Sequence, residues 1–206
     1  MSANHPRPPA RSSIIVISGP SGVGKTTICR RILEARPDIW YSVSATSRPR
    51  RVGERNGREY YFLSRRRFQA WIKRRAFTEW AVVHGHYYGT PIRYLQQHLE
   101  SGRHVLLDVD VQGGRSLKKL YPRGIFIFIR PPSYRELTRR LVKRNTEDAV
   151  ALRKRLAAAW KEIRSRRAYG HTVVNDDLDR TVKRILGIID KETRTPMSKT
   201  KFQISN

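Results

Sequence analysis

The segment GPSGVGKT, residues 19–26, carries the residue types that bind a chain of phosphates. It matches the pattern G-x-x-x-x-G-K-[ST] at every fixed position, with an apolar run before it and a helical pattern after it. Glycines here let successive backbone N–H groups point into one concavity and bind phosphate oxygens. Lys25 adds a charge for the β- and γ-phosphates, and the Thr26 hydroxyl is a ligand for Mg²⁺. The expected contacts to the nucleoside triphosphate come from Gly19, Pro20, Ser21, Gly22, Val23, Gly24, Lys25, Thr26 and Thr27.

Two carboxylates end a second apolar run, VLLDVD, as a metal-assisted phosphate site requires. Asp108 and Asp110 are two residues apart, so in a strand they project from the same face. We expect Asp108 to stand near the Mg²⁺ ion together with Thr26. An ordinary strand-end carboxylate facing solvent is the alternative interpretation for either residue.

A second group of polar residues suits a phosphate monoester and a base. Arg48 and Arg51 lie in SRPRR, and arginine forks bind phosphate oxygens through paired hydrogen bonds, while Tyr60 and Tyr88 add hydroxyl donors. Glu79 lies among apolar neighbours in FTEW, where a carboxylate is costly unless it accepts strong hydrogen bonds. Guanine offers two parallel donors, N1–H and its exocyclic amine. A charge at a strand edge is the alternative for Glu79.

The elements that must position these groups alternate between strands and helices. Strands are expected over residues 14–18, 104–110, 124–129 and 172–175. Helices are expected over residues 25–36, 114–120, 133–144, 148–168 and 178–191. Such alternation predicts an α/β fold of three layers, in which helices cover both faces of a central parallel sheet.

One segment departs from this alternation. Residues 42–101 are richer in turns, aromatic residues and short strands, expected at 60–63 and 77–83. The segment ends in a helix for which we expect Thr90 as N-cap and Pro91 as the first helical residue. It is interpreted as a small lobe inserted into the α/β core and facing the substrate.

Length and composition set further bounds. The 206 residues suit one domain, and the single cysteine, Cys29, excludes an internal disulfide framework and a cysteine-rich zinc site. No apolar run approaches the roughly 18 residues of a membrane span. Residues 1–13 resemble no secretory signal and are expected to form a flexible extension; residues 191–206 are expected to form a loose tail. A cytoplasmic location is the expectation, with no membrane partner.

The charge is strongly positive: 43 Lys and Arg against 17 Asp and Glu give a formal charge of +26. A chain of this kind seeks anions. Basic clusters at residues 65–67, 73–75 and 164–167 belong to neither proposed phosphate site and could form a surface for nucleic acid or an acidic partner. Because no RNA- or DNA-binding motif accompanies them, a solvated basic surface is favoured, with nucleic-acid binding only weak and non-specific.

Several strings, in this order and spacing, resemble the guanylate kinase family: GPSGVGKTT, SVSATSRPRRVGERNGREYYFLS, FTEWAVVHGHYYGT, LDVDVQG, RLVKRNT and VVNDDLD. The similarity extends from about residue 14 to 189. The resemblance implies phosphorylation of GMP by ATP with Mg²⁺, no general base, and use of dGMP as well. It implies a core of residues 14–41, 102–138 and 169–190, a GMP-binding lobe of residues 42–101 and a helical lid of residues 139–168.

The resemblance also implies roles for individual residues. The expected guanine contacts are Ser44, Glu79, Thr90 and Asp110. The expected contacts to the GMP phosphate are Arg48, Arg51, Tyr60 and Tyr88. Asn175 is expected beside adenine. The residues expected to act on the transferring phosphoryl group are Lys25, Arg48 and the lid arginines Arg140, Arg144 and Arg155.

Two other functions share parts of this pattern. A guanylate-kinase-like module that binds a protein partner without catalysis is one, but the intact Gly24-Lys25-Thr26 sequence argues against it. A related kinase of a phosphorylated sugar is the other, and it would have no use for the guanine-contacting set. Whether the protein is a monomer or a homodimer stays open at this point.

Overall fold

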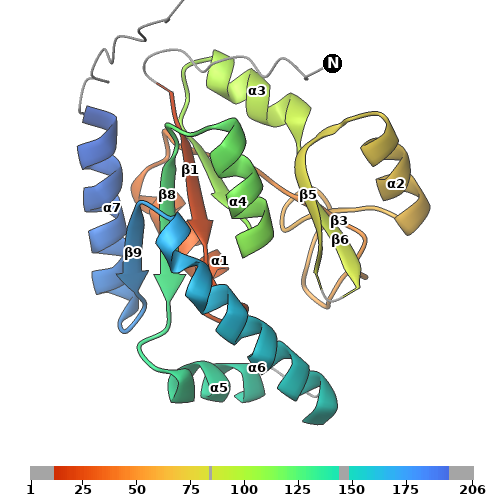
Figure 1. The fold of residues 1–206 in the computed structure, drawn as a ribbon. Coiled ribbons are helices and arrows are strands. Elements are labelled where there is room, and N and C mark those ends of the chain that lie inside the picture. The colour runs from red at the N-terminus through yellow and green to blue at the C-terminus, as the bar shows by residue number, and fades with distance from the viewer. Residues whose placement is uncertain (1–11, 84, 144–148, 195–206) are drawn as a thin grey trace, which may run out of the picture.

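The computed structural model describes residues 12–83, 85–143 and 149–194. Its centre is a parallel sheet of five strands in the order β2-β7-β1-β8-β9 (Figure 1). The strands are β1 (Ile14–Ser18), β2 (Trp40–Tyr41), β7 (Val105–Asp108), β8 (Ile125–Arg130) and β9 (His171–Val174). The predicted α/β fold with a central parallel sheet is confirmed.

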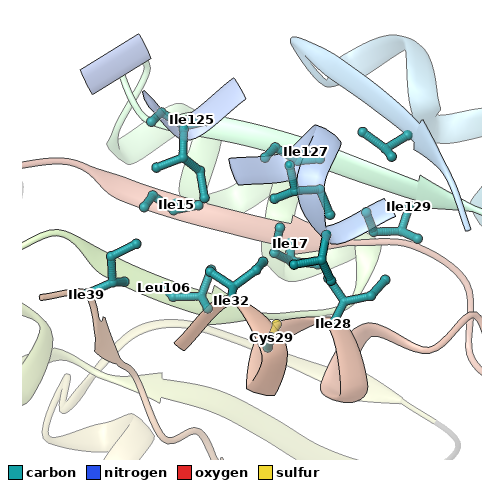
Figure 2. Packing of buried hydrophobic residues seen from close by; sticks show 14 of the residues in the cluster. Ile15, Ile17, Ile28, Cys29, Ile32, Ile39, Leu106, Ile125, Ile127 and Ile129 are labelled. Atoms are coloured by element: carbon teal, nitrogen blue, oxygen red, sulfur yellow. The ribbon is translucent and has the colours of Figure 1, made fainter. Parts of the chain in front are cut away.

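Three layers arise because alternate side chains of each strand point to opposite faces. Ile15 and Ile17 of β1 pack with helices α1 (Lys25–Ala35) and α7 (Leu178–Arg194), as Figure 2 shows around Ile28 and Ile32. Val16 packs on the other face, with helices α3 (Ile92–Glu100) and α4 (Val111–Leu120). These side chains are fully buried, so the central sheet is a rigid base for the loops at its carboxyl edge.

Residues 42–91 form a lobe to the right of the core in Figure 1, whereas α3, the last helix of the expected lobe of residues 42–101, packs on the central sheet. A second sheet has the order β4-β3-β6-β5, and its strands are β3 (Ala45–Thr46), β4 (Tyr61–Phe62), β5 (Phe77–Val83) and β6 (His86–Pro91). Helix α2 (Arg65–Lys73) packs on it through Phe68, whose ring stacks on that of Phe77 at 4.4 Å between centroids. The lobe therefore has a small apolar core of its own.

After β8 the chain forms α5 (Tyr134–Lys143), α6 (Ala149–Arg164) and the short 3-10 helix η1 (Ser165–Ala168). Leu137 and Leu141 of α5 pack against Ala159 of α6, apart from the main core. In Figure 1 these helices extend below the sheet, and α6 leads back toward it. No helix among the described residues is long and apolar enough to cross a membrane.

The structure corrects the expected strand ending in two aspartates. β7 ends at Asp108, and Asp110 is the N-cap of α4, where its side chain accepts a hydrogen bond from Gly113 N at 2.8 Å. The two carboxylates thus do not project from one strand face, and α4 begins at Val111 rather than at residue 114. The reason is that a carboxylate beside free helix N–H groups caps the helix in preference to extending the strand.

The expected start of α3 is also wrong by one residue. Thr90 and Pro91 both belong to β6, and α3 begins at Ile92, with Pro91 at the N-cap position and no side-chain capping bond. Pairing of Pro91 with Phe77 prolongs the strand. The Thr90 hydroxyl is used elsewhere, in a hydrogen bond to Glu79.

Candidate active site

The phosphate loop connects β1 to α1 at the carboxyl edge of the central sheet. Gly22 and Gly24 have φ angles of 83° and 99°, in the left-handed region that side chains rarely adopt. The Lys25 ammonium donates to the carbonyl oxygens of Gly19 at 2.9 Å and Pro20 at 3.4 Å. Lys25 is thereby held across its own loop, next to the N-terminus of α1, where phosphate oxygens are stabilised.

Asn175, which follows β9, forms a hydrogen bond to the backbone of this loop. Its side-chain amide is buried and donates to the carbonyl oxygen of Val23 at 2.7 Å. A Cβ atom on Gly24 would lie 2.8 Å from the same amide nitrogen, so only glycine fits there. The family resemblance implies that Asn175 lies beside adenine, and in the structure its amide also bonds to the backbone of the phosphate loop.

Thr26 and Asp108 come together although 82 positions separate them. The Thr26 hydroxyl donates to Asp108 Oδ2 at 3.0 Å. Burial raises the pKa of the Asp108 carboxyl, while the Lys25 charge and the Thr26 hydrogen bond act in the opposite direction. Mg²⁺ prefers oxygen ligands and takes few of them from the protein when phosphates supply the rest. This hydroxyl and carboxylate fit that ion.

Arg140 of α5 reaches the phosphate loop. Its guanidinium donates to the backbone carbonyls of Asn175 at 3.3 Å and Val23 at 3.5 Å, and to the Glu136 carboxylate at 2.8 Å. Arg144 lies outside the described residues. Arg155 lies in α6, but its side chain is not among the described parts. Of the three expected lid arginines, the structure therefore places the guanidinium of one.

A further carboxylate, Glu162, touches the loop and was not predicted. It accepts a hydrogen bond from Ser21 N at 3.3 Å. Burial raises the pKa of the Glu162 carboxyl, and the nearby Lys25 charge lowers it. The sequence offers one signal for this role: Glu162 is the only acidic residue in the basic sequence of α6.

Glu79 is enclosed between the lobe and the core. Its side chain is buried and accepts a hydrogen bond from the Thr90 hydroxyl at 2.7 Å. Burial raises the pKa of the Glu79 carboxyl to about 7, and the nearby Asp110 carboxylate adds to this. A Cβ atom on Gly113 would lie 2.7 Å from Glu79 Oε2. Three of the expected guanine contacts, Glu79, Thr90 and Asp110, thus meet at the start of α4.

The expected phosphate-binding residues surround Arg48. Its guanidinium stands 5.6 Å from the centre of the Tyr60 ring, which lies 5.9 Å from that of Tyr88. Glu54 holds Arg48 through two hydrogen bonds, at 2.7 and 3.1 Å, and also accepts from Arg51 N at 2.7 Å. Glu54 was not predicted, although a carboxylate within a run of arginines was a signal for it.

Ser44 immediately precedes β3, beside this group. Its carbonyl oxygen accepts a hydrogen bond from Tyr61 N at 2.9 Å, which ties the start of β3 to β4. The Arg51 side chain is exposed. The site thus comprises a phosphate loop on the core and two groups on the lobe: Arg48 with Tyr60 and Tyr88, and Glu79 with Thr90.

Comparison with known proteins identifies the family. The family model described as "Guanylate kinase" matches residues 11–192. A guanylate kinase of Caldanaerobacter subterraneus subsp. tengcongensis is 46% identical over 179 residues, covering 87% of each chain. One from Syntrophotalea carbinolica is 47% identical over 176 residues, covering 85% of this chain and 84% of the other.

A solved structure has the same fold. The crystal structure of guanylate kinase from Anaplasma phagocytophilum superposes with a TM-score of 0.78 at 33% identity. The match covers 92% of this chain and 90% of that one. Extent, identity and fold agree, and the chain belongs to the guanylate kinase family.

Proposed function

We propose that the protein transfers the γ-phosphoryl group of ATP to GMP, with ADP and GDP as products, and that it also accepts dGMP. The observation that carries this proposal is the buried Glu79 carboxylate beside Thr90, in a chain whose phosphate loop is complete. Guanine offers N1–H and an exocyclic amine to one carboxylate, whereas adenine has an acceptor at N1. Ser44 and Asp110 are proposed to complete the contacts to the base.

The lobe is proposed to hold the GMP phosphate. Arg48 and Arg51 supply charge, and the Tyr60 and Tyr88 hydroxyls supply further hydrogen bonds. Glu54 keeps the Arg48 guanidinium in place before GMP arrives, since its carboxylate accepts two bonds from it. A group held in advance loses less conformational entropy when the ligand binds.

The core is proposed to hold ATP. Backbone N–H groups of residues 19–27 surround the phosphates, Lys25 neutralises charge on them, and Asn175 keeps the loop in shape. Thr26 and Asp108 would hold Mg²⁺, which supplies charge neutralisation on the phosphate oxygens when bound. These roles rest on the geometry of the loop and on the family's pattern.

No side chain is needed as a general base. The acceptor is an oxygen of the GMP phosphate, which is already anionic; it forms the new bond to the γ-phosphorus as the bond from that phosphorus to the bridging oxygen breaks, and the electron pair leaves with ADP. Such transfer depends on in-line placement and charge stabilisation. Arg140, Arg144 and Arg155 are proposed to stabilise the transferring group and to help exclude water.

A coupled assay of ADP release with GMP, AMP, CMP and UMP as acceptors tests the proposal. We expect GMP to be preferred over AMP by more than about tenfold, because binding adenine leaves the Glu79 carboxylate unpaired. Equal turnover of AMP and GMP would contradict the assignment of Glu79. Absence of turnover with all four acceptors would favour a binding module without catalysis.

We also propose that the protein acts in the cytoplasm on these small-molecule substrates. The sequence feature that supports this location is the single cysteine, Cys29, which leaves no possibility of an internal disulfide.

A further inference from the structure

Helix α2 and the two residues after it form a strongly basic surface, here called the α2 surface. Its members, all exposed, are Arg65, Arg66, Arg67, Lys73, Arg74 and Arg75. No acidic residue occurs between residues 65 and 78. Within the described parts of the chain, no carboxylate forms an ion pair with any of the six. The opposite side of the helix is apolar and buries Phe68. The positive charge therefore faces solvent without an internal counter-charge.

Arg75 occupies a backbone position that normally belongs to glycine. Its φ angle is 53°, and it is the only non-glycine residue with a positive φ among those the structure describes. Arg75 N bonds to Ile72 O at 2.9 Å and Ala76 N to Trp71 O at 3.0 Å, the pattern of a helix end that favours glycine. Strained backbone conformations of this kind are concentrated at functional sites, where the side chain itself is needed.

The Arg75 side chain lines a cavity of about 360 Å³ between α2, β5 and α4. The cavity walls include Ile72, Phe77, Trp80 and Ser116. Its volume lies in the range of small-molecule sites. Glu79 also reaches this wall, from the strand that carries it into the proposed guanine site.

Trp80 adds an exposed aromatic residue to a cavity that borders a basic surface. It lies on β5, the edge strand of the lobe sheet, and 46% of it is exposed. Its ring is 6.0 Å from that of Tyr87, and the guanidinium of Arg65 stands 5.2 Å from the Tyr87 ring centre. An exposed aromatic face thus lies between arginines at the two ends of α2.

We propose that the α2 surface and this cavity bind single-stranded nucleic acid without sequence preference, a property beyond the proposed kinase activity. The arginines would contact successive phosphates, and a base would stack against Trp80 beside Arg75. Positive grooves that carry aromatic side chains bind single strands in this way. A duplex fits less well because its base faces are stacked, and an acidic peptide has no planar ring for Trp80.

The test is fluorescence anisotropy with a labelled oligothymidylate of about 12 nucleotides, in about 50 and 150 mM salt. Saturating ADP and GMP keep the oligonucleotide out of the kinase site. The variants are Arg75→Gly, which suits the backbone and removes the charge, and Trp80→Ala. The control is Arg123→Gln, which removes one exposed charge from the turn before β8.

We expect Trp80→Ala to weaken binding about tenfold with little change in salt dependence. Arg75→Gly should lower the slope of log affinity against log salt by about 0.7, the value for one phosphate contact to a single strand. Arg75→Gly should fold at least as stably as the parent chain, so a loss of affinity cannot be ascribed to unfolding. GMP turnover should persist in all three variants, and Arg123→Gln should bind like the parent.

Other outcomes would overturn the proposal. These are equal loss in Arg123→Gln, no loss in Arg75→Gly and Trp80→Ala, or duplex DNA bound as tightly as the single strand. Preferential binding to anionic phospholipid vesicles or to a polyglutamate peptide, with the same variants impaired, would assign the surface to that partner instead.

Discussion

The buried Glu79 carboxylate, our proposed guanine contact, destabilises the folded chain when it is ionised. Its pKa of about 7 in the folded chain exceeds its ordinary value of 4.5, because burial disfavours the charged form. Below pH 4.5 both states are protonated and there is no penalty. As the pH rises from 4.5 to about 7, the unfolded chain loses this proton first, so the free energy of unfolding falls. Above about pH 7 the full penalty is present.

Glu79→Gln should therefore stabilise the protein above pH 7 and abolish its preference for GMP. Each unit of pKa shift corresponds to about 1.4 kcal/mol, so the shift from 4.5 to about 7 predicts a gain on the order of 3 kcal/mol in denaturant unfolding at pH 8, and little change at pH 4. The Gln amide would face guanine donors with its own donors, so GMP affinity should fall by more than about tenfold. Equal stability of the two proteins at pH 8 would contradict this.

The pH dependence of GMP binding provides a second measurement on the same residue. We expect the affinity of the parent chain to fall as the pH drops below about 7, because protonated Glu79 no longer accepts two hydrogen bonds. The phosphate of GMP also titrates in this range. Since that contribution is common to both proteins, the ratio of parent to Glu79→Gln affinity isolates the carboxyl group.

Lys25 and Arg48 should separate the two substrates. Lys25→Ala should abolish turnover and leave GMP binding nearly unchanged, whereas Arg48→Ala should weaken GMP and spare ATP. Because Arg48→Ala also deprives Glu54 of its partner, Glu54→Gln is the comparison: if ordering of Arg48 matters, this variant loses part of the GMP affinity as well. Calorimetry measures the affinity of each variant for ATP and for GMP. Identical losses of affinity for both ligands would show that the sites are misassigned.

The start of α4 is the element that joins lobe and core. Asp110 caps the helix, Gly113 approaches Glu79, and a Cβ atom on Gly114 would lie 2.2 Å from the Tyr169 hydroxyl. That hydroxyl in turn donates to Ser18 Oγ at 2.9 Å, at the end of β1. Glycine is used at these two positions because the side chains of Glu79 and Tyr169, from two other segments, lie against this part of the helix.

Gly113→Ala should raise the KM for GMP by about tenfold or more, because the added methyl group displaces the Glu79 carboxylate. The matched control is Gly187→Ala in α7, where a Cβ atom meets nothing within 4 Å. That control should gain roughly 0.5–1 kcal/mol from helix propensity and keep parental kinetics. Steady-state kinetics and thermal unfolding of both variants check this, and an unchanged KM in Gly113→Ala would refute the contact.

The net charge of +26 creates a positive electrostatic field that should raise the rate at which the anionic substrates bind. Replacing Arg65, Arg66, Arg67, Lys73, Arg74 and Arg75 by Gln should change kcat/KM for GMP little at about 0.15 M salt, where charges are screened beyond roughly 8 Å. At low ionic strength the same variant should lose up to about tenfold, because a positive field steers anions toward the site. Replacing the five arginines by Lys keeps the charge and should restore the rate; a low-salt loss that persists there would point to lost contacts.

Much of this protein could be predicted from local sequence. The phosphate loop was predictable because glycine spacing and the Lys-Thr pair act within a few residues, and the α/β alternation because strand and helix periods repeat locally. The inserted segment, residues 42–101, was predictable because turns and aromatic residues are more frequent there than in the alternating strands and helices around it. Element ends were less certain: capping and pairing compete over one or two residues, as at Asp110 and Thr90.

Only the tertiary structure decided which distant groups meet. In the folded chain Glu79 lies against Gly113, Arg48 is hydrogen-bonded to Glu54, and Glu162 accepts a hydrogen bond from the phosphate loop. It also set Arg75 beside Trp80. Such contacts depend on how helices and the lobe pack on the sheet. A periodic pattern specifies which face of an element is buried, but the partner across that face is selected by the packing of the whole chain.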